Sequence, residues 1–186
     1  MMMAFNIIIG LVQVVGNSYY GIFIYQHYRG SYFGGFLNIA IVFLIAVFSS
    51  LIGYLIAKMN IKSYGSIFML VIGGIFLSAM PFVYYLGSSL GLLTAGTIIG
   101  VIGASALGVS SSMLLIELLH EQDRESYYIL SGIFSVIPYM IFVPIFSYAA
   151  QKFNLGIVFL ALSIVTIVFT AILLASYNFS RKTLFL

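Results

Sequence analysis

Six long apolar runs, separated by short polar stretches, constrain this chain more than any other feature. A helix of about 20 apolar residues spans the hydrocarbon core of a bilayer, which is about 30 Å thick. Each run reaches that length. Hydrophobic residues make up 63% of the 186 residues and charged residues 6%, whereas a typical soluble domain has about 25% charged residues. The sequence therefore predicts an integral membrane protein.

The runs predict an all-α fold, because they lack the alternation of apolar and polar residues that is typical of outer-membrane barrel strands. We expect one domain, residues 1–186, in which six transmembrane helices pack as a single polytopic bundle. The expected spans are residues 4–25, 35–57, 66–86, 90–119, 127–150 and 156–177. The most polar stretch, residues 120–126, is expected to be a solvated loop that holds Glu121, Asp123 and Glu125.

The basic residues predict the orientation of these spans. Six crossings place both termini on the same side of the membrane. That side then holds Lys58, Lys62, Arg124, Arg181 and Lys182, and the other side holds Arg29 and Lys152. Short loops rich in Lys and Arg stay in the cytoplasm. We therefore expect a multi-pass protein of the cell membrane with cytoplasmic N- and C-termini.

Charge and composition argue against several functional classes. The net charge of +3 comes from scattered Lys and Arg, without the clustered basic face that nucleic-acid binding needs. The chain has no Cys, and its two histidines, His27 and His120, fall on opposite sides of the predicted membrane. We therefore expect no metal and no cofactor. Ser110, Ser111 and Ser112 have no buried histidine near them in the sequence, so we do not expect an enzyme.

A stripe of small residues runs along the fourth span. Its members recur every four residues: Gly96, Gly100, Ala104, Gly108 and Ser112. Because lipid tails are as apolar as leucine, membrane helices associate through small residues that let their backbones approach closely. The stripe predicts a helix-packing face; the alternative is a path or a sliding surface used in gating. Gly73 and Gly74 of the third span allow the same interpretation.

The segment after the second span resembles a loop of the major facilitator superfamily. In these transporters, a glycine and small apolar residues precede Asp-Arg-x-Gly-Arg-Lys between helices two and three. The matching positions are Gly53, Leu55, Lys58 and Lys62. Ala57 stands where the family has aspartate, and Asn60 where it has its second glycine. The resemblance implies that Gly53, Lys58 and Lys62 belong to a gating loop.

The second half of the chain extends this resemblance. Residues 116–119, Arg124, Pro144 and Gly156 are spaced similarly to features of helices four to six of the family. The resemblance implies a six-helix half, most like the N-terminal half, of a twelve-helix transporter with alternating access. One bundle supplies one wall of a solute site. We therefore expect a truncated chain, a homodimer, or a partner that supplies a second six-helix half.

Polar side chains inside the predicted spans are candidates for a solute site. Gln13 and Asn17 share a helix face in the first span, and Asn38 of the second span is expected to face them. Polar groups at membrane depth are costly unless they are used, and uncharged amides suit hydroxyl-rich or neutral solutes. The alternative is that these side chains form hydrogen bonds between helices.

Two further groups complete the predictions. Tyr19, Tyr20 and Tyr25 are expected to be aromatic residues of the outer membrane interface, where tyrosine is enriched. Glu117 is expected to form an ion pair with His120 or Arg124, which lie three and seven residues later. Its alternative role is proton coupling.

The predicted function is membrane transport of a small solute as part of a major facilitator-type transporter. The alternative is a membrane scaffold or assembly protein that transports nothing. In both cases the lipid bilayer is the first partner of the chain.

Overall fold

A computed structural model describes residues 10, 18–87 and 89–183, except for the side chains of residues 133–139 and 177–183. Residues 18–28 form a short helix. Five long helices follow: α2 (Gly35–Tyr64), α3 (Ser66–Leu86), α4 (Leu90–Leu118), α5 (Glu121–Lys152) and α6 (Leu155–Thr183). The described residues contain no strand, so the predicted all-α class is confirmed for this part of the chain.

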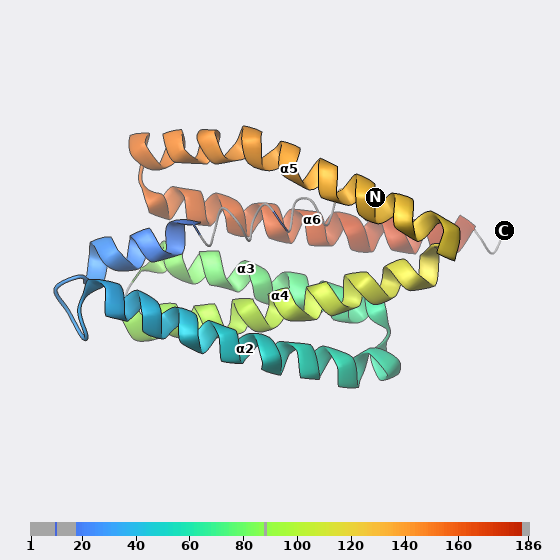
Figure 1. Cartoon of the computed structure of the whole chain (residues 1–186), viewed down its shortest axis with the longest axis horizontal. Coiled ribbons are helices and arrows are strands. Elements are labelled where there is room, and N and C mark those ends of the chain that lie inside the picture. The colour runs from blue at the N-terminus through green and yellow to red at the C-terminus, as the bar shows by residue number, and fades with distance from the viewer. Residues whose placement is uncertain (1–9, 11–17, 88, 184–186) are drawn as a thin grey trace.

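The long helices run side by side along the longest axis of the molecule (Figure 1). The most extensive interface joins α3 and α4. Helix α2 packs on α4, α6 packs on α3, and α5 packs mainly on α6. Helix 18–28 lies at one end of the bundle (Figure 1). Its side chains join the largest buried cluster, which includes residues of α2, α3, α4 and α6.

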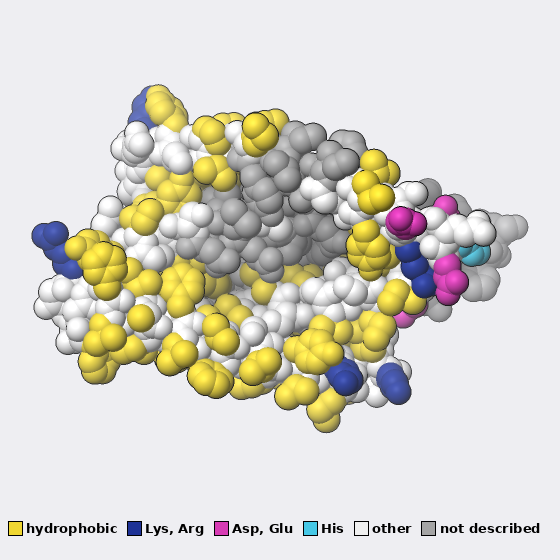
Figure 2. Space-filling model, in the orientation of Figure 1, with side chains coloured by type: hydrophobic (Ala, Val, Ile, Leu, Met, Phe, Trp, Pro, Cys, Tyr) yellow, Lys and Arg dark blue, Asp and Glu magenta, His cyan; other side chains and the backbone are white. Residues whose placement is uncertain are grey.

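The outer surface of the bundle is apolar. Four helical segments within the described residues are long and apolar enough to cross a membrane: Gly35–Tyr64, Ser66–Leu86, Leu90–Leu118 and Leu155–Ser176. On the face in Figure 2, charged side chains gather at the two ends and hydrophobic ones lie between them. Phe36 and Met59 are 77% and 76% exposed. Apolar surface on this scale indicates a membrane-embedded protein.

The predicted basic turn after the second span is helical. Helix α2 continues through Lys58 and Lys62 and ends at Tyr64. The connection to α3 is Gly65 alone, with φ of 83°, a value that L side chains rarely adopt. Lysine is a good helix former, so a pair of lysines does not end a helix. The predicted end at residue 57 is therefore wrong, and the glycine is the break.

The predicted solvated loop at residues 120–126 is also helical. Helix α5 begins at Glu121, directly after the extended residue His120. The side chains of Glu121 and Asp123 lie in its first turn, where a negative charge is favourable beside the positive end of the helix dipole. Arg124 donates from Nη2 to the Ile116 carbonyl oxygen at 3.0 Å, across the junction with α4. A polar stretch can thus continue a helix beyond the membrane.

Glycines bring the backbones of α3 and α4 into contact. A Cβ added at Gly103 would lie 2.6 Å from the Gly73 carbonyl oxygen, and one at Gly73 would lie 2.9 Å from the Gly103 carbonyl oxygen. A Cβ added at Gly96 would lie 2.7 Å from the Cβ of Val83, and one at Gly100 would overlap the side chain of Met80. Real Cβ contacts are longer, so α3 and α4 can lie this close only with glycine at these positions.

The C-terminal part of the predicted stripe does not lie in this interface. The side chain of Ala104 packs at the edge of a buried cluster, but a Cβ added at Gly108 would meet no described atom within 4 Å. No described residue packs against Gly108, so its packing against another helix stays a prediction. At 3.6 residues per turn, a step of twelve residues from Gly96 to Gly108 turns the helix by about 120°. A strict four-residue repeat thus winds out of the contact.

Candidate functional site

A cavity of about 720 Å³ opens at the end of the bundle that carries helix 18–28. We call it the vestibule. It lies between helix 18–28, the end of α3, the end of α5 and the start of α6. Its polar side chains are Tyr19, Gln26, His27, Tyr85, Ser147, Gln151 and Asn154. Most of these residues belong to helix ends rather than to the middle of a predicted span.

A buried aromatic cluster adjoins the vestibule through Phe23, which lines the cavity. The Phe23 ring lies 5.4 Å from Phe159 and 5.7 Å from Tyr84, centroid to centroid. The ring of Tyr20 lies 4.4 Å from Tyr84 and 5.2 Å from Phe159. The hydroxyl groups of Tyr84 and Thr97 lie 3.1 Å apart. These rings form an apolar floor beneath a polar cavity.

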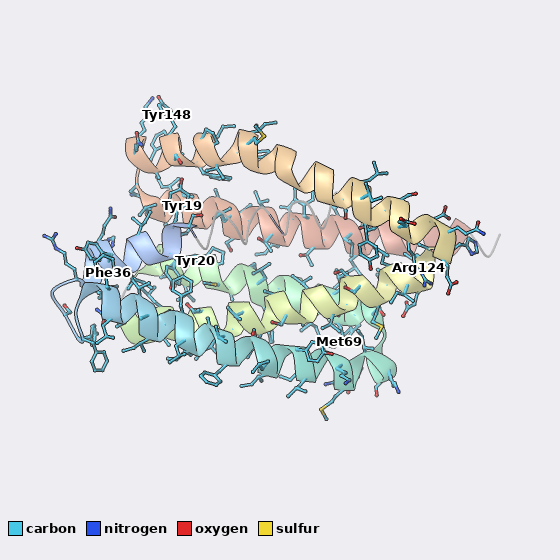
Figure 3. All side chains as sticks on the ribbon, viewed as in Figure 1. Tyr19, Tyr20, Phe36, Met69, Arg124 and Tyr148 are labelled. Atoms are coloured by element: carbon cyan, nitrogen blue, oxygen red, sulfur yellow. The ribbon has the colours of Figure 1, made fainter. Side chains whose placement is uncertain are left out.

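One hydrogen bond joins helix 18–28 to α5 beside the vestibule. The hydroxyl oxygen of Tyr19 contacts Oγ of Ser147, and both residues line the cavity. Figure 3 shows Tyr19 and Tyr20 on the short helix, at the end of the bundle near α5 and α6. The bond fixes the position of the α5 end against a helix that is distant in the sequence.

The vestibule offers both donors and acceptors. Nδ1 of His27 lies 3.0 Å from the Phe23 carbonyl oxygen. A carbonyl oxygen only accepts, so Nδ1 is the donor of this bond, and in the neutral form of the ring Nε2 is an acceptor. The His27 ring also stacks on Phe23, with centroids 4.1 Å apart. Oδ1 of Asn154 accepts from the Ile157 amide at 2.9 Å, which leaves the Asn154 NH₂ group as a donor.

The charges at the two ends of the bundle differ. The described residues that line the vestibule include no acid. Arg29 and Lys152 lie at this end of the helices, and the Lys152 ammonium lies 5.7 Å from the Tyr148 ring centroid. All four acids of the sequence, Glu117, Glu121, Asp123 and Glu125, lie around the junction of α4 and α5 at the other end. The described lining of the vestibule therefore has no acid, and the Lys and Arg residues at this end of the bundle lie outside the lining.

Asn38 organises the loop next to the vestibule. Its side chain is fully buried. Nδ2 donates to the carbonyl oxygens of Tyr28 at 2.9 Å and Ser31 at 3.0 Å, and Oδ1 accepts from the Phe33 amide at 3.2 Å. These bonds use both ends of the amide. The expected ligand contact is thus replaced by a structural one, because a reversing loop has backbone groups that need partners.

Tyr28 ties the same loop to α3. Its hydroxyl group donates to the Gly87 carbonyl oxygen at 2.9 Å. Burial, and then the neighbouring Tyr32 phenol, raise the pKa of Tyr28 above the usual tyrosine value. The phenol therefore keeps its proton, and its ability to donate, at physiological pH.

The other members of the predicted solute site lie outside the described residues: Gln13 and Asn17 are not placed. The predicted interface tyrosines are only partly where we expected them. Tyr19 and Tyr20 are buried, at 9% and 3% exposure, so the prediction of an interface position is wrong for both. Tyr25 remains partly exposed and its ring lies 5.0 Å from that of Phe36, centroid to centroid.

The three predicted gating-loop residues occupy one helix. Gly53 is buried against α4, where an added Cβ would lie 2.6 Å from the Ile102 carbonyl oxygen. Lys58 and Lys62 are exposed on the last turns of α2. Gly53 therefore has a packing role in this arrangement, and the role of the two lysines in gating stays a prediction.

Glu117 does not form the predicted ion pair. Its Oε1 accepts from the Ser66 hydroxyl group at 2.8 Å, which links the end of α4 to the start of α3. Arg124 instead bonds to backbone carbonyl oxygens and lies 4.0 Å from Glu121. His120 forms no ion pair with Glu117 among the described residues. The pairing failed because α5 turns back at residue 120, so sequence spacing no longer sets the distance.

The vestibule was not predicted from the sequence. Gln26, His27, Gln151 and Asn154 fall between the predicted spans, and only the predicted topology, which places both connections on the same side of the membrane, could have linked them. No family model, curated protein or solved structure matches this chain. The resemblance to the major facilitator superfamily therefore stays a prediction based on the motif.

Proposed function

We propose that this chain forms one half of a major facilitator-type transporter and carries a small uncharged polar solute across the cell membrane. Six crossings with both termini in the cytoplasm place the vestibule on the outer side. A second copy or a separate six-helix half then supplies the facing wall of the path. What supports the proposal is the vestibule: a cavity with both polar and apolar lining residues at one end of a bundle whose outer surface is apolar.

The lining chemistry favours a solute rich in hydroxyl or amide groups. Gln26, Gln151 and Asn154 can each donate, and the two glutamines and Nε2 of His27 can accept. The rings of Phe23 and Tyr85 offer apolar faces beside them. A cation would find no acid among the described lining residues. Ligand sites commonly combine such apolar walls with a few directed polar groups.

A transport role explains the cavity better than a scaffold role does. A cavity of about 720 Å³ lined by side chains with hydrogen-bonding groups gives a solute a place to bind, which a scaffold does not need. The packed aromatic rings beside the vestibule are the part of the bundle that would close this path. Alternating access requires a closed layer of this kind on one side of the solute site.

Flux measurements test the proposal. The purified chain is reconstituted into vesicles and the uptake of radiolabelled monosaccharides and polyols is measured. Replacing Gln26 and Gln151 with leucine should lower uptake about tenfold, because two hydrogen bonds to the solute are lost. The matched control is Gln122→Leu, an exposed glutamine at the other end of α5, which should leave uptake unchanged.

Two results would contradict the proposal. One is equal uptake by the double variant and the unchanged protein. The other is absence of uptake for every solute in the panel, with the chain alone and with candidate second halves, which would favour the scaffold.

A further inference from the structure

A second cavity, of about 500 Å³, lies at the opposite end of the bundle from the vestibule. It is bordered by the junction of α2 and α3, by the end of α4 and by Leu174 of α6. Glu117 contributes the only carboxylate to its described lining, and Tyr64 and Phe68 contribute two aromatic rings. We call it the Glu117 cavity. Its lining carries an acid, whereas the described lining of the vestibule carries none.

The charge of Glu117 has no neutralising partner among the described residues. The Ser66 hydroxyl group binds Oε1 at 2.8 Å. Within 4.0 Å, the described side chains form one ion pair, Arg124 with Glu121, and it does not include Glu117. Glu117 is exposed at the end of α4, so the rest of its carboxylate stays open to a ligand. The site is therefore suited to a cation.

Two aromatic rings favour an organic cation over a metal ion. The ring centroids of Tyr64 and Phe68 lie 5.4 Å apart, with an angle of 34° between the ring planes. Ring faces attract ammonium groups through their quadrupole, and apolar substituents on the ammonium gain contact area. A metal ion needs several oxygen or nitrogen ligands, and no group of three or more His, Cys, Asp or Glu side chains among the described residues could hold one.

We propose that the Glu117 cavity binds a small organic cation, an ammonium group with apolar substituents. Glu117 supplies the counter-charge, and Tyr64 and Phe68 cover the apolar part. This ammonium can belong to a free amine or to a lipid headgroup, which have the same charged chemistry. The site is independent of the proposed transport of a neutral solute, because the two cavities share no lining residue.

Glu117 also has a competing role that needs no ligand. Its carboxylate lies at the N-terminal end of α3, where the helix dipole favours a negative charge. In that case Glu117 only anchors α3 through Ser66. A structural anchor changes stability when it is removed but does not bind an added cation, so binding separates the two roles.

The direct test is titration of the purified protein in detergent with phenyltrimethylammonium, followed by ligand-observed NMR. We expect saturable binding that Glu117→Gln weakens about tenfold or more. Glutamine keeps an oxygen that can accept from Ser66, so the hydrogen bond survives while the charge is lost. Phe68→Leu, which keeps the charge, should weaken binding about threefold.

Two controls and one further outcome can contradict the proposal. Tert-butylbenzene, the uncharged isostere of the probe, must not compete for the site. Glu121→Gln, which removes an exposed acid outside the cavity, must leave probe binding unchanged. Binding that appears only after Arg181 and Lys182 are both replaced by glutamine would mean that the tail of the chain supplies the counter-charge, and would overturn the proposal.

Lipid composition then separates the two sources of the ammonium. The titration is repeated in nanodiscs of phosphatidylglycerol alone and of phosphatidylcholine alone. Weaker probe binding in phosphatidylcholine identifies the lipid headgroup as the occupant, and equal binding in both identifies a free amine. Absence of saturable binding in detergent and in both nanodiscs, with the protein folded by circular dichroism, overturns the proposal.

Discussion

The interface of α3 and α4 and the attachment of α5 are held in different ways. Between α3 and α4, Gly73 and Gly103 bring the two backbones together, and Met80 and Val83 pack onto Gly100 and Gly96. Helix α5 touches α6 and only a small part of α4. Many of its large apolar side chains are exposed, including Met140 and Tyr148. Figure 3 shows Tyr148 at the edge of the bundle, pointing away from it.

From this difference we expect the α3–α4 pair to be a rigid part of the molecule and α5 to be a part that moves. Close backbone packing loses many contacts at once when two helices separate, so the α3–α4 interface should persist through a transport cycle. The end of α5 is joined to helix 18–28 by the bond between Tyr19 and Ser147. Because α5 forms one wall of the vestibule, its displacement would change access to the cavity.

The largest effect is expected from a substitution in the α3–α4 interface. Gly103→Leu places a side chain where even a Cβ would lie 2.6 Å from the Gly73 carbonyl oxygen. We expect a loss of about 3 kcal/mol of stability, because overpacking forces the helices apart. Thermal unfolding in detergent measures it. Gly108→Leu is the matched control, since no described atom lies within 4 Å of its Cβ position; an equal loss there would contradict the assigned interface.

A smaller effect is expected where α3 meets α6. A Cβ added at Gly74 would overlap the side chain of Thr170. Gly74→Val should therefore cost about 2 kcal/mol of stability. Thr170→Ala removes the overlapping atoms and should restore most of the loss in the double variant, as measured by the same unfolding experiment. Additive losses in the double variant would mean that the two residues are not in contact.

The rigid part was easier to predict from the sequence than the vestibule. The apolar runs predicted α3 closely, because a glycine bounds each end of the run and a membrane helix needs about 20 residues. The C-terminal end of α2 and the start of α5 were predicted wrongly. Lys58, Lys62 and Glu121 can continue a helix as readily as a loop once the chain leaves the membrane. Hydropathy measures burial in lipid, and it does not measure where a helix stops.

The contacts of the polar residues depend on which helices are neighbours. Asn38 was expected to face a solute, but both its Oδ1 and its Nδ2 form hydrogen bonds with the backbone of the neighbouring chain reversal. The pairing of Ser66 with Glu117 joins residues 51 apart in the sequence, and Tyr19 with Ser147 joins residues 128 apart. Without the order in which the helices pack, no spacing rule brings these residues together.

A third prediction concerns the hydrogen bond that joins α5 to helix 18–28. Tyr19→Phe with Ser147→Ala removes one hydrogen bond and should cost about 1 kcal/mol of stability or less. The greater effect should be on access. In a Gln151→Cys background, which has a single cysteine, the rate of maleimide labelling in the vestibule should rise about threefold. Tyr148→Phe is the control, because its ring lies on α5 but outside the cavity. An unchanged labelling rate in the double variant would mean that other contacts hold α5 in place.

The smallest effect is expected at Tyr28. It tests whether the loop beside this residue belongs with α3 and α4 or with α5. Its hydroxyl group bonds to the Gly87 carbonyl oxygen, at the end of α3 rather than on α5. Tyr28→Phe should cost about 0.5–1 kcal/mol of stability and leave maleimide labelling of Gln151→Cys unchanged, because the loop and α3 both belong to the rigid part. Faster labelling in this variant would show that the loop also controls access. Helix 18–28 would then belong with α5, and the division between rigid and mobile parts would run through the vestibule floor instead of along α5.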